Sequence, residues 1–147
     1  MPLFAGASRE ELRRVYLDAW TRDRAAMPLT PVQAQVAAVM REHPGYHGWL
    51  ERGEAALSEE FTPARGLPNP FLHLGMHLAL REQVATDRPA GIRGAADRLA
   101  ERTGSRHEAE HAMMEALGAA LWEAQRSGTA PDERLYFERI LRLAGTP

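Results

Sequence analysis

The sequence predicts an all-α fold, a compact helical bundle of about five to six helices, and two observations support this. Alanine, leucine, arginine and glutamate dominate, whereas isoleucine occurs only at Ile92 and Ile140, so helix formers greatly outnumber strand formers. In addition, serine or threonine is followed three residues later by glutamate or glutamine at several points, which is typical of helix N-termini. With 147 residues the chain has the length of one ordinary domain, and we expect a single helical domain over residues 1–147.

The first two helices are predicted from their caps. Ser8 with Glu11 forms a capping pattern in front of an amphipathic run. Thr30 with Gln33 forms a second such pattern and has a proline at the first helical position. The second helix should stop by His43, because a residue that precedes proline is disfavoured in the helical region.

The middle of the chain is divided by prolines and glycines. A short helical segment is expected over residues 44–57, and residues 58–69 resemble a loop because they contain prolines and a glycine and lack periodicity. A third helix should begin at Asn69–Pro70 and continue to about Thr86, where residues 87–89 break it.

Three further helices complete the prediction. The fourth spans roughly Pro89 to Thr103 and ends on a glycine. Ser105 with Glu108 caps the longest helix, which continues to Ser127 and is again followed by glycine. The last helix is predicted to begin at Pro131.

The histidines are the most informative residues of the chain. All six fall into pairs with the same spacing of four residues: His43 with His47, His73 with His77, and His107 with His111. Residues four apart on a helix share a face, with Cβ atoms about 5–6 Å apart. Two such imidazoles can bind one metal ion at Zn–N distances of about 2.0–2.1 Å. The repeated spacing therefore predicts metal binding.

The second and third pairs are the best ligand candidates. His73 and His77 lie beside an apolar stripe of the third predicted helix, and His107 and His111 are aligned with Glu115 on the fifth. Two such helices side by side would bring four imidazoles and a carboxylate into one bundle interior. We therefore expect a mononuclear or dinuclear centre built from these five residues.

The first pair is a weaker candidate. Because a helix stop separates His43 from His47, the two side chains need not share a helical face. Both remain candidate ligands of the same centre.

Composition restricts the chemistry of such a centre. The chain has no cysteine, and all of its basic residues are arginines. Thiolate ligands, disulfides, Schiff-base chemistry and a Walker lysine are thereby excluded. Nitrogen and oxygen ligands suit a divalent transition metal, with iron or zinc expected first and manganese or nickel as alternatives. Iron would support redox chemistry, and zinc would support hydrolysis through water activated by Glu108, Glu110 or Glu115.

Two alternatives to this interpretation remain open. The sequence from His107 to His111 reads H-E-x-x-H, the pattern in which two histidines bind zinc and the glutamate activates water, so a small zincin-like hydrolase is one alternative. However, Glu108 is also explained as the third helical residue after the cap Ser105. The other alternative is a non-catalytic helical interaction module whose histidines are structural or sense pH.

Charge and hydropathy give expectations about partners and location. A net charge of −2 argues against a nucleic-acid surface. The row of arginines from Arg88 to Arg106 is interpreted as a solvated helix face, with an anion-binding patch as the alternative. No apolar stretch approaches the about 20 residues that span a membrane, and charged residues interrupt the first thirty, unlike a signal peptide. We expect a cytoplasmic protein with no membrane partner, an unidentified small-molecule partner or none, and a homo-oligomer as an open possibility.

Four sequence blocks carry a family resemblance. They are residues 69–84 (NPFLHLGMHLALREQV), 87–93 (DRPAGIR), 107–115 (HEAEHAMME) and 121–126 (LWEAQR). Together with their spacing, these blocks resemble a bacterial family termed domain of unknown function 1841, over nearly the whole chain. The resemblance implies no particular activity, cofactor or site residue.

Overall fold

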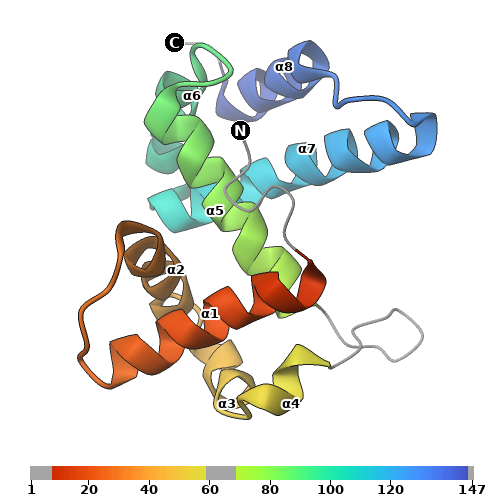
Figure 1. The fold of residues 1–147 in the computed structure, drawn as a ribbon. Helices are drawn as coiled ribbons and strands as arrows, with labels where there is room; N and C mark the ends of the chain where they lie inside the picture. The colour runs from red at the N-terminus through yellow and green to blue at the C-terminus, as the bar shows by residue number, and fades with distance from the viewer. Residues whose placement is uncertain (1–7, 59–68, 146–147) are drawn as a thin grey trace. The chain divides into compact units, whose positions relative to one another are not determined.

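The computed structural model describes residues 8–58 and 69–145, and this part of the chain is helical without any β-strand (Figure 1). The all-α prediction is therefore confirmed. The predicted number of five to six helices is wrong, because the described residues form eight α-helices and one 3-10 helix. The difference arises over residues 44–57, where the single expected segment is divided into three short ones. Of the loop expected over 58–69, residues 59–68 lie outside the described residues.

The helices group into two units, one up to Leu78 and one from Ala79 onwards. The single-domain expectation stays a prediction. The first unit contains five complete helical segments and the N-terminal part of a sixth. In chain order these are α1 (Arg9–Arg24), α2 (Pro31–Arg41), η1 (Pro44–Tyr46), α3 (His47–Leu50), α4 (Glu54–Leu57) and the beginning of α5 (Pro70–Thr86).

Local capping positions the two long helices of the first unit. The Ser8 hydroxyl accepts a hydrogen bond from the backbone amide of Glu11 at the start of α1. At the start of α2, Thr30 and Gln33 form a reciprocal capping box. Both helices thus begin where the sequence predicts, because a cap needs only residues within one turn.

The core of the first unit is aromatic and aliphatic. Buried side chains of α1, α2, α3, α4 and α5 form one apolar cluster, which includes Tyr16, Trp20, Val36, Met40, Trp49, Leu50, Phe71 and Leu74. Arg13, only 4% exposed, lies at the edge of this core. Its guanidinium donates to the carbonyl of Leu57 at 3.0 Å and sits 4.7 Å from the ring centroid of Phe71. The buried charge of Arg13 thereby stabilises the C-terminal end of α4.

The second unit contains the remainder of α5 and three further helices, α6 (Ile92–Thr103), α7 (Arg106–Ser127) and α8 (Glu133–Ala144). The start of α6 lies three residues later than predicted, at Ile92 and not at Pro89, because Gly91 has a φ of 98°, outside the right-handed helical region. The start of α8 is also later, since the residue that caps it is Asp132, whose side chain accepts from the amide of Leu135 at 3.0 Å.

The second unit has an apolar core to which all four of its helices contribute. Its buried side chains include Leu80 of α5, Ile92 and Leu99 of α6, Met113 of α7 and Ile140 of α8.

Three arginines of the predicted solvated row are tied to the second unit itself. Arg93 donates to the carbonyls of Val84 and Ala85, Arg102 donates to that of Leu143, and Arg106 binds Asp97. These contacts join α6 to the end of α5, to α8 and to the start of α7.

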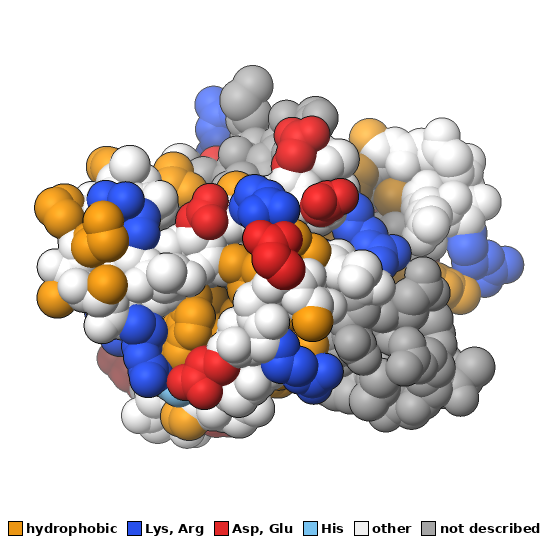
Figure 2. Space-filling view, turned by 60° about the horizontal axis from the view of Figure 1, so that its bottom comes forward, with side chains coloured by type: hydrophobic (Ala, Val, Ile, Leu, Met, Phe, Trp, Pro, Cys, Tyr) orange, Lys and Arg blue, Asp and Glu red, His pale blue; other side chains and the backbone are white. Residues whose placement is uncertain are grey.

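The surface carries charges of both signs. Figure 2 shows one face of the molecule, on which basic and acidic side chains are interspersed. Within the described ranges no helix is both long enough and apolar enough to cross a bilayer.

Candidate metal centre

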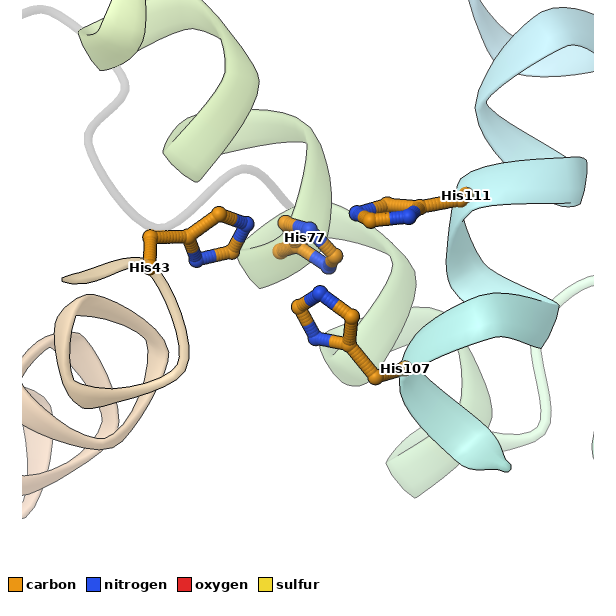
Figure 3. Close-up of side chains that lie close together, drawn as sticks. All are labelled: His43, His77, His107 and His111. Atoms are coloured by element: carbon orange, nitrogen blue, oxygen red, sulfur yellow. The ribbon is translucent and has the colours of Figure 1, made fainter. Parts of the chain in front are cut away.

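Three imidazoles lie in mutual contact in the first unit. His73 and His77 stand on successive turns of α5, and His43 lies just beyond the end of α2. The ring centroids are 4.9 Å apart for His43 and His73, 4.7 Å for His43 and His77, and 4.9 Å for His73 and His77. In Figure 3 the ring of His43 points toward His77. His77 is fully buried, so at least one of these rings is out of contact with bulk water.

Hydrogen bonds define the tautomer of His43. Its Nδ1 atom lies 2.8 Å from the carbonyl oxygen of Val39. A carbonyl can only accept, so Nδ1 carries the proton, and the Nε2 atom of the neutral ring keeps its lone pair. The Nε2 atom of His73 lies 3.1 Å from His43 Nε2 and donates to it. The lone pair on His43 Nε2 is therefore directed at the histidines of α5. The Nδ1 atom of His43 is anchored to a carbonyl, as is usual for metal-binding histidines.

His47 is held differently. Its Nε2–H donates to the carbonyl of Met40 at 2.8 Å, and its ring lies against Trp20 with centroids 4.5 Å apart. Val39 and Met40 belong to the last turn of α2, and their carbonyls also accept from the backbone amides of Glu42 and His43 just beyond the helix. His43 and His47 thus both cap the C-terminal end of α2. Sequence reasoning missed this role, although basic residues just after a helix stop are a known capping signal.

Tyr46 is a neighbour of this cluster that the sequence did not single out. Its ring stacks on His43 at 5.4 Å with planes 4° apart, and it meets His73 edge-on at 6.1 Å. Burial raises the pKa of the Tyr46 phenol above its usual range, because the charged phenolate is disfavoured away from water.

The second unit contains the histidine pair that the sequence predicts on α7. His107 and His111 project from adjacent turns of that helix (Figure 3), with ring centroids 4.3 Å apart. One ring nitrogen of each lies within 4.8 Å of one ring nitrogen of the other, and the same holds for His43 and His77 in the first unit. Nitrogen ligands of one tetrahedral ion stand about 3.4 Å apart when Zn–N bonds are about 2.1 Å long. Small side-chain rotations would bring either pair to that separation.

The three candidate carboxylates lie in different surroundings. Glu110 is 3% exposed and is bound by Arg81 through contacts of 3.1–3.2 Å that involve both of its oxygens. Glu108 is exposed; its carboxylate lies 3.6 Å from His111 Nδ1, and its backbone amide is bound by the Ser105 hydroxyl. Glu115 is exposed and lines a groove beside α8. Glu108 is therefore a carboxylate in contact with a candidate ligand histidine.

Comparison with known proteins adds a family. Neither a curated protein nor a solved structure matches the chain. The family model described as a domain of unknown function, DUF1841, matches residues 8–142. Because the match extends over most of the chain, the protein belongs to the DUF1841 family.

Proposed function

We propose that this protein binds a divalent transition-metal ion through histidine nitrogens. The ligands in the first unit are His43, His73 and His77, and those in the second unit are His107 and His111. The observation that carries the proposal is the contact of three imidazoles in the first unit. Iron or zinc fits this nitrogen-rich set, with manganese and nickel as alternatives.

Packing alone is a poor explanation for three imidazoles in contact. Each ring brings two nitrogen atoms that need hydrogen-bond partners when water is excluded, and aliphatic side chains would fill the same volume without that need. A cation instead uses one lone pair from each ring. The anchoring of His43 to Val39 supports this use, because it orients Nε2 toward the other two rings.

The prediction that the pairs serve one centre, made from their equal spacing, is part of the proposal. Within the second unit, the guanidinium of Arg81 binds Glu110, the residue next to His111, and so holds the turn of α7 that carries the second histidine pair.

A metal ion held by three of these histidines would keep a coordination position for water or a substrate. When bound, zinc would supply a water molecule of lowered pKa, whereas iron would supply redox chemistry. Glu108, with its carboxylate beside His111, is the group that we propose to accept a proton from such a water molecule.

The second candidate is a non-catalytic helical module with structural histidines. The capping of α2 by His43 and His47 favours it, because both rings have a role in the fold without any metal.

Elemental analysis of protein purified without a histidine tag distinguishes the two candidates. We expect one transition-metal ion per chain, and loss of the ion in His77→Ala and in His111→Ala. The matched control is His47→Gln, whose amide can still donate to Met40 and which should keep the ion. Titration of cobalt(II) into the metal-free protein, followed by its visible absorption, gives a second readout of nitrogen ligation.

Three outcomes contradict parts of the proposal. Absence of metal from the purified protein, together with no cobalt(II) binding, would exclude a metal centre and favour the structural role. Two ions per chain, one lost in each variant, would exclude a shared centre. Equal metal loss in His47→Gln would mean that the cap at α2, and not ligation, governs occupancy.

A further inference from the structure

A groove of the second unit, between α7 and α8, has a lining of mixed character. Its volume is about 350 Å³, within the range of about 300–1,000 Å³ that is usual for small-molecule sites. Its apolar lining consists of Ala116, Ala119 and Leu143. Its charged lining consists of Glu115, Arg139 and Arg142.

One guanidinium nitrogen at this groove is buried without a hydrogen-bond partner. Arg139 uses Nη2 to donate to Glu123 at 2.8 Å, whereas its Nη1 atom is enclosed and has no acceptor among the residues that the structure describes. Buried polar atoms of native proteins are nearly always paired, and an unpaired N–H of a charged group is costly. An acceptor supplied by a bound molecule would remove this cost.

Arg142 adds a second cation to the same lining. It stands three residues beyond Arg139 on α8, so the two project from neighbouring positions of one helix face. Arg142 makes no ion pair with any residue of the described ranges. Glu123 offsets the charge of Arg139 and Glu115 lies in the same lining as Arg142, so the groove has no large excess of positive charge, which suits a monoanion better than a polyphosphate.

We propose that this groove binds a small aliphatic monocarboxylate. A rotation of the Arg139 guanidinium would bring Nη1 to the groove, where one carboxylate oxygen accepts from it and the other oxygen pairs with Arg142 through a charge-assisted contact. The aliphatic part lies over Ala119 and Leu143, where small side chains leave room for it. This site consists only of residues of α7 and α8, and it does not depend on the metal proposal.

Butyrate, with butyramide as its uncharged counterpart, tests the proposal on the full chain. We expect sodium butyrate to shift backbone amide resonances of α7 and α8 saturably, and butyramide to shift them far less. Arg142→Gln should weaken butyrate binding about tenfold, the loss expected for one charge-assisted contact. Ala119→Leu should abolish binding by filling the groove while leaving both arginines in place. Arg134→Gln is the matched control on the same helix, since that side chain is 90% exposed and pairs with Glu138; it should bind like the parent protein.

Several results would overturn the proposal. Equal shifts with butyrate and butyramide would exclude a carboxylate site. The same shifts with sodium sulfate at equal ionic strength would mean that any anion is attracted. Equal weakening in Arg134→Gln and Arg142→Gln would indicate a diffuse charge effect. Because Arg142 is exposed and unpaired in the described structure, its variant is expected to fold even if Ala119→Leu does not.

Discussion

Single polar residues of the first unit, one buried and two partly buried, donate to specific carbonyl groups. Arg13 donates to Leu57, His43 to Val39, and His47 to Met40. Each of these acceptors belongs to the last turn of a helix, where carbonyls lack a partner within the helix. These side chains therefore have a structural task in addition to any chemical one.

Tyr16 leads to a prediction about alkaline pH. Burial raises its pKa to about 12, whereas an unfolded tyrosine titrates near about 10. Between these values the unfolded chain loses the proton and the folded chain keeps it, so the free energy of unfolding falls as the pH rises. The contribution of Tyr16 to the free energy of unfolding is fully present below about pH 10. About 2–3 kcal/mol of this contribution is lost by pH 12.

Guanidinium unfolding between pH 8 and 11 measures this effect. In Tyr16→Phe we expect a shallower decline of stability with pH than in the parent protein. Identical slopes for the two proteins would contradict the assignment to Tyr16.

Two glycines near the same end of α6 should respond to alanine in opposite directions. Gly91 has a φ of 98°, and a Cβ there would lie 3.0 Å from the Phe137 ring, so Gly91→Ala should destabilise by about 1–3 kcal/mol. Gly94 is inside the helix, and its Cβ would meet no atom closer than 3.7 Å, so Gly94→Ala should stabilise by about 0.5–1 kcal/mol. Thermal unfolding of both variants checks the signs, and a shift in the same direction would refute the argument.

At the scale of helices, an ion pair ties α5 to α7. Glu110 is almost completely buried, and Arg81 holds both of its carboxylate oxygens. Loss of one partner of a buried ion pair leaves the other charge in a medium of low polarity, which costs more than loss of both. This pair therefore stabilises the packing of the α7 turn that carries His107 and His111.

A double-mutant cycle tests the coupling of these two helices. We expect Arg81→Met to lower the free energy of unfolding by about 3–5 kcal/mol. The double variant Arg81→Met, Glu110→Met should be clearly more stable than the sum of the two single effects implies. Denaturant unfolding of the four proteins gives the coupling energy, and additive single effects would show that the pair contributes little.

At the scale of the whole molecule, helix α5 has residues in the cores of both units. Leu74 belongs to the apolar cluster of the first unit, and Leu80 is buried in the second. Because a ligand that binds only folded protein stabilises it by mass action, the proposed metal ion would raise the melting temperature of the protein.

Chelation gives the corresponding prediction. At a hundredfold excess of metal over its dissociation constant, binding adds about 2.7 kcal/mol, or about 5–10 °C for a chain of this length. A chelator should lower the melting temperature of the parent protein by that amount and leave the double variant His77→Ala, His111→Ala unchanged. Structural histidines would produce the reverse pattern, in which the double variant melts lower and the chelator affects neither protein.

Much of the helix pattern could be derived from the sequence, because helix ends depend on residues within one turn of each other. The caps Ser8, Thr30 and Ser105 all accept from the amide of the third helical residue. A predicted helix boundary is wrong where the backbone conformation departs from the local pattern, as at Gly91, whose left-handed conformation shifts the start of α6 to Ile92. The division of residues 44–57 has a similar cause at Gly53, whose φ of 60° separates α3 from α4.

The candidate metal centre shows which features depend on sequence spacing and which depend on tertiary structure. The spacing of the histidines by itself determined that His73 and His77 share a face of α5, and that His107 and His111 share a face of α7, because a helix repeats every 3.6 residues. Only the tertiary structure decided that His43 contacts His73, thirty residues away, while His47 turns to Met40. It likewise paired Glu110 with Arg81. Contacts across such separations depend on how helices pack, and packing is a property of the folded chain and not of any short stretch of it.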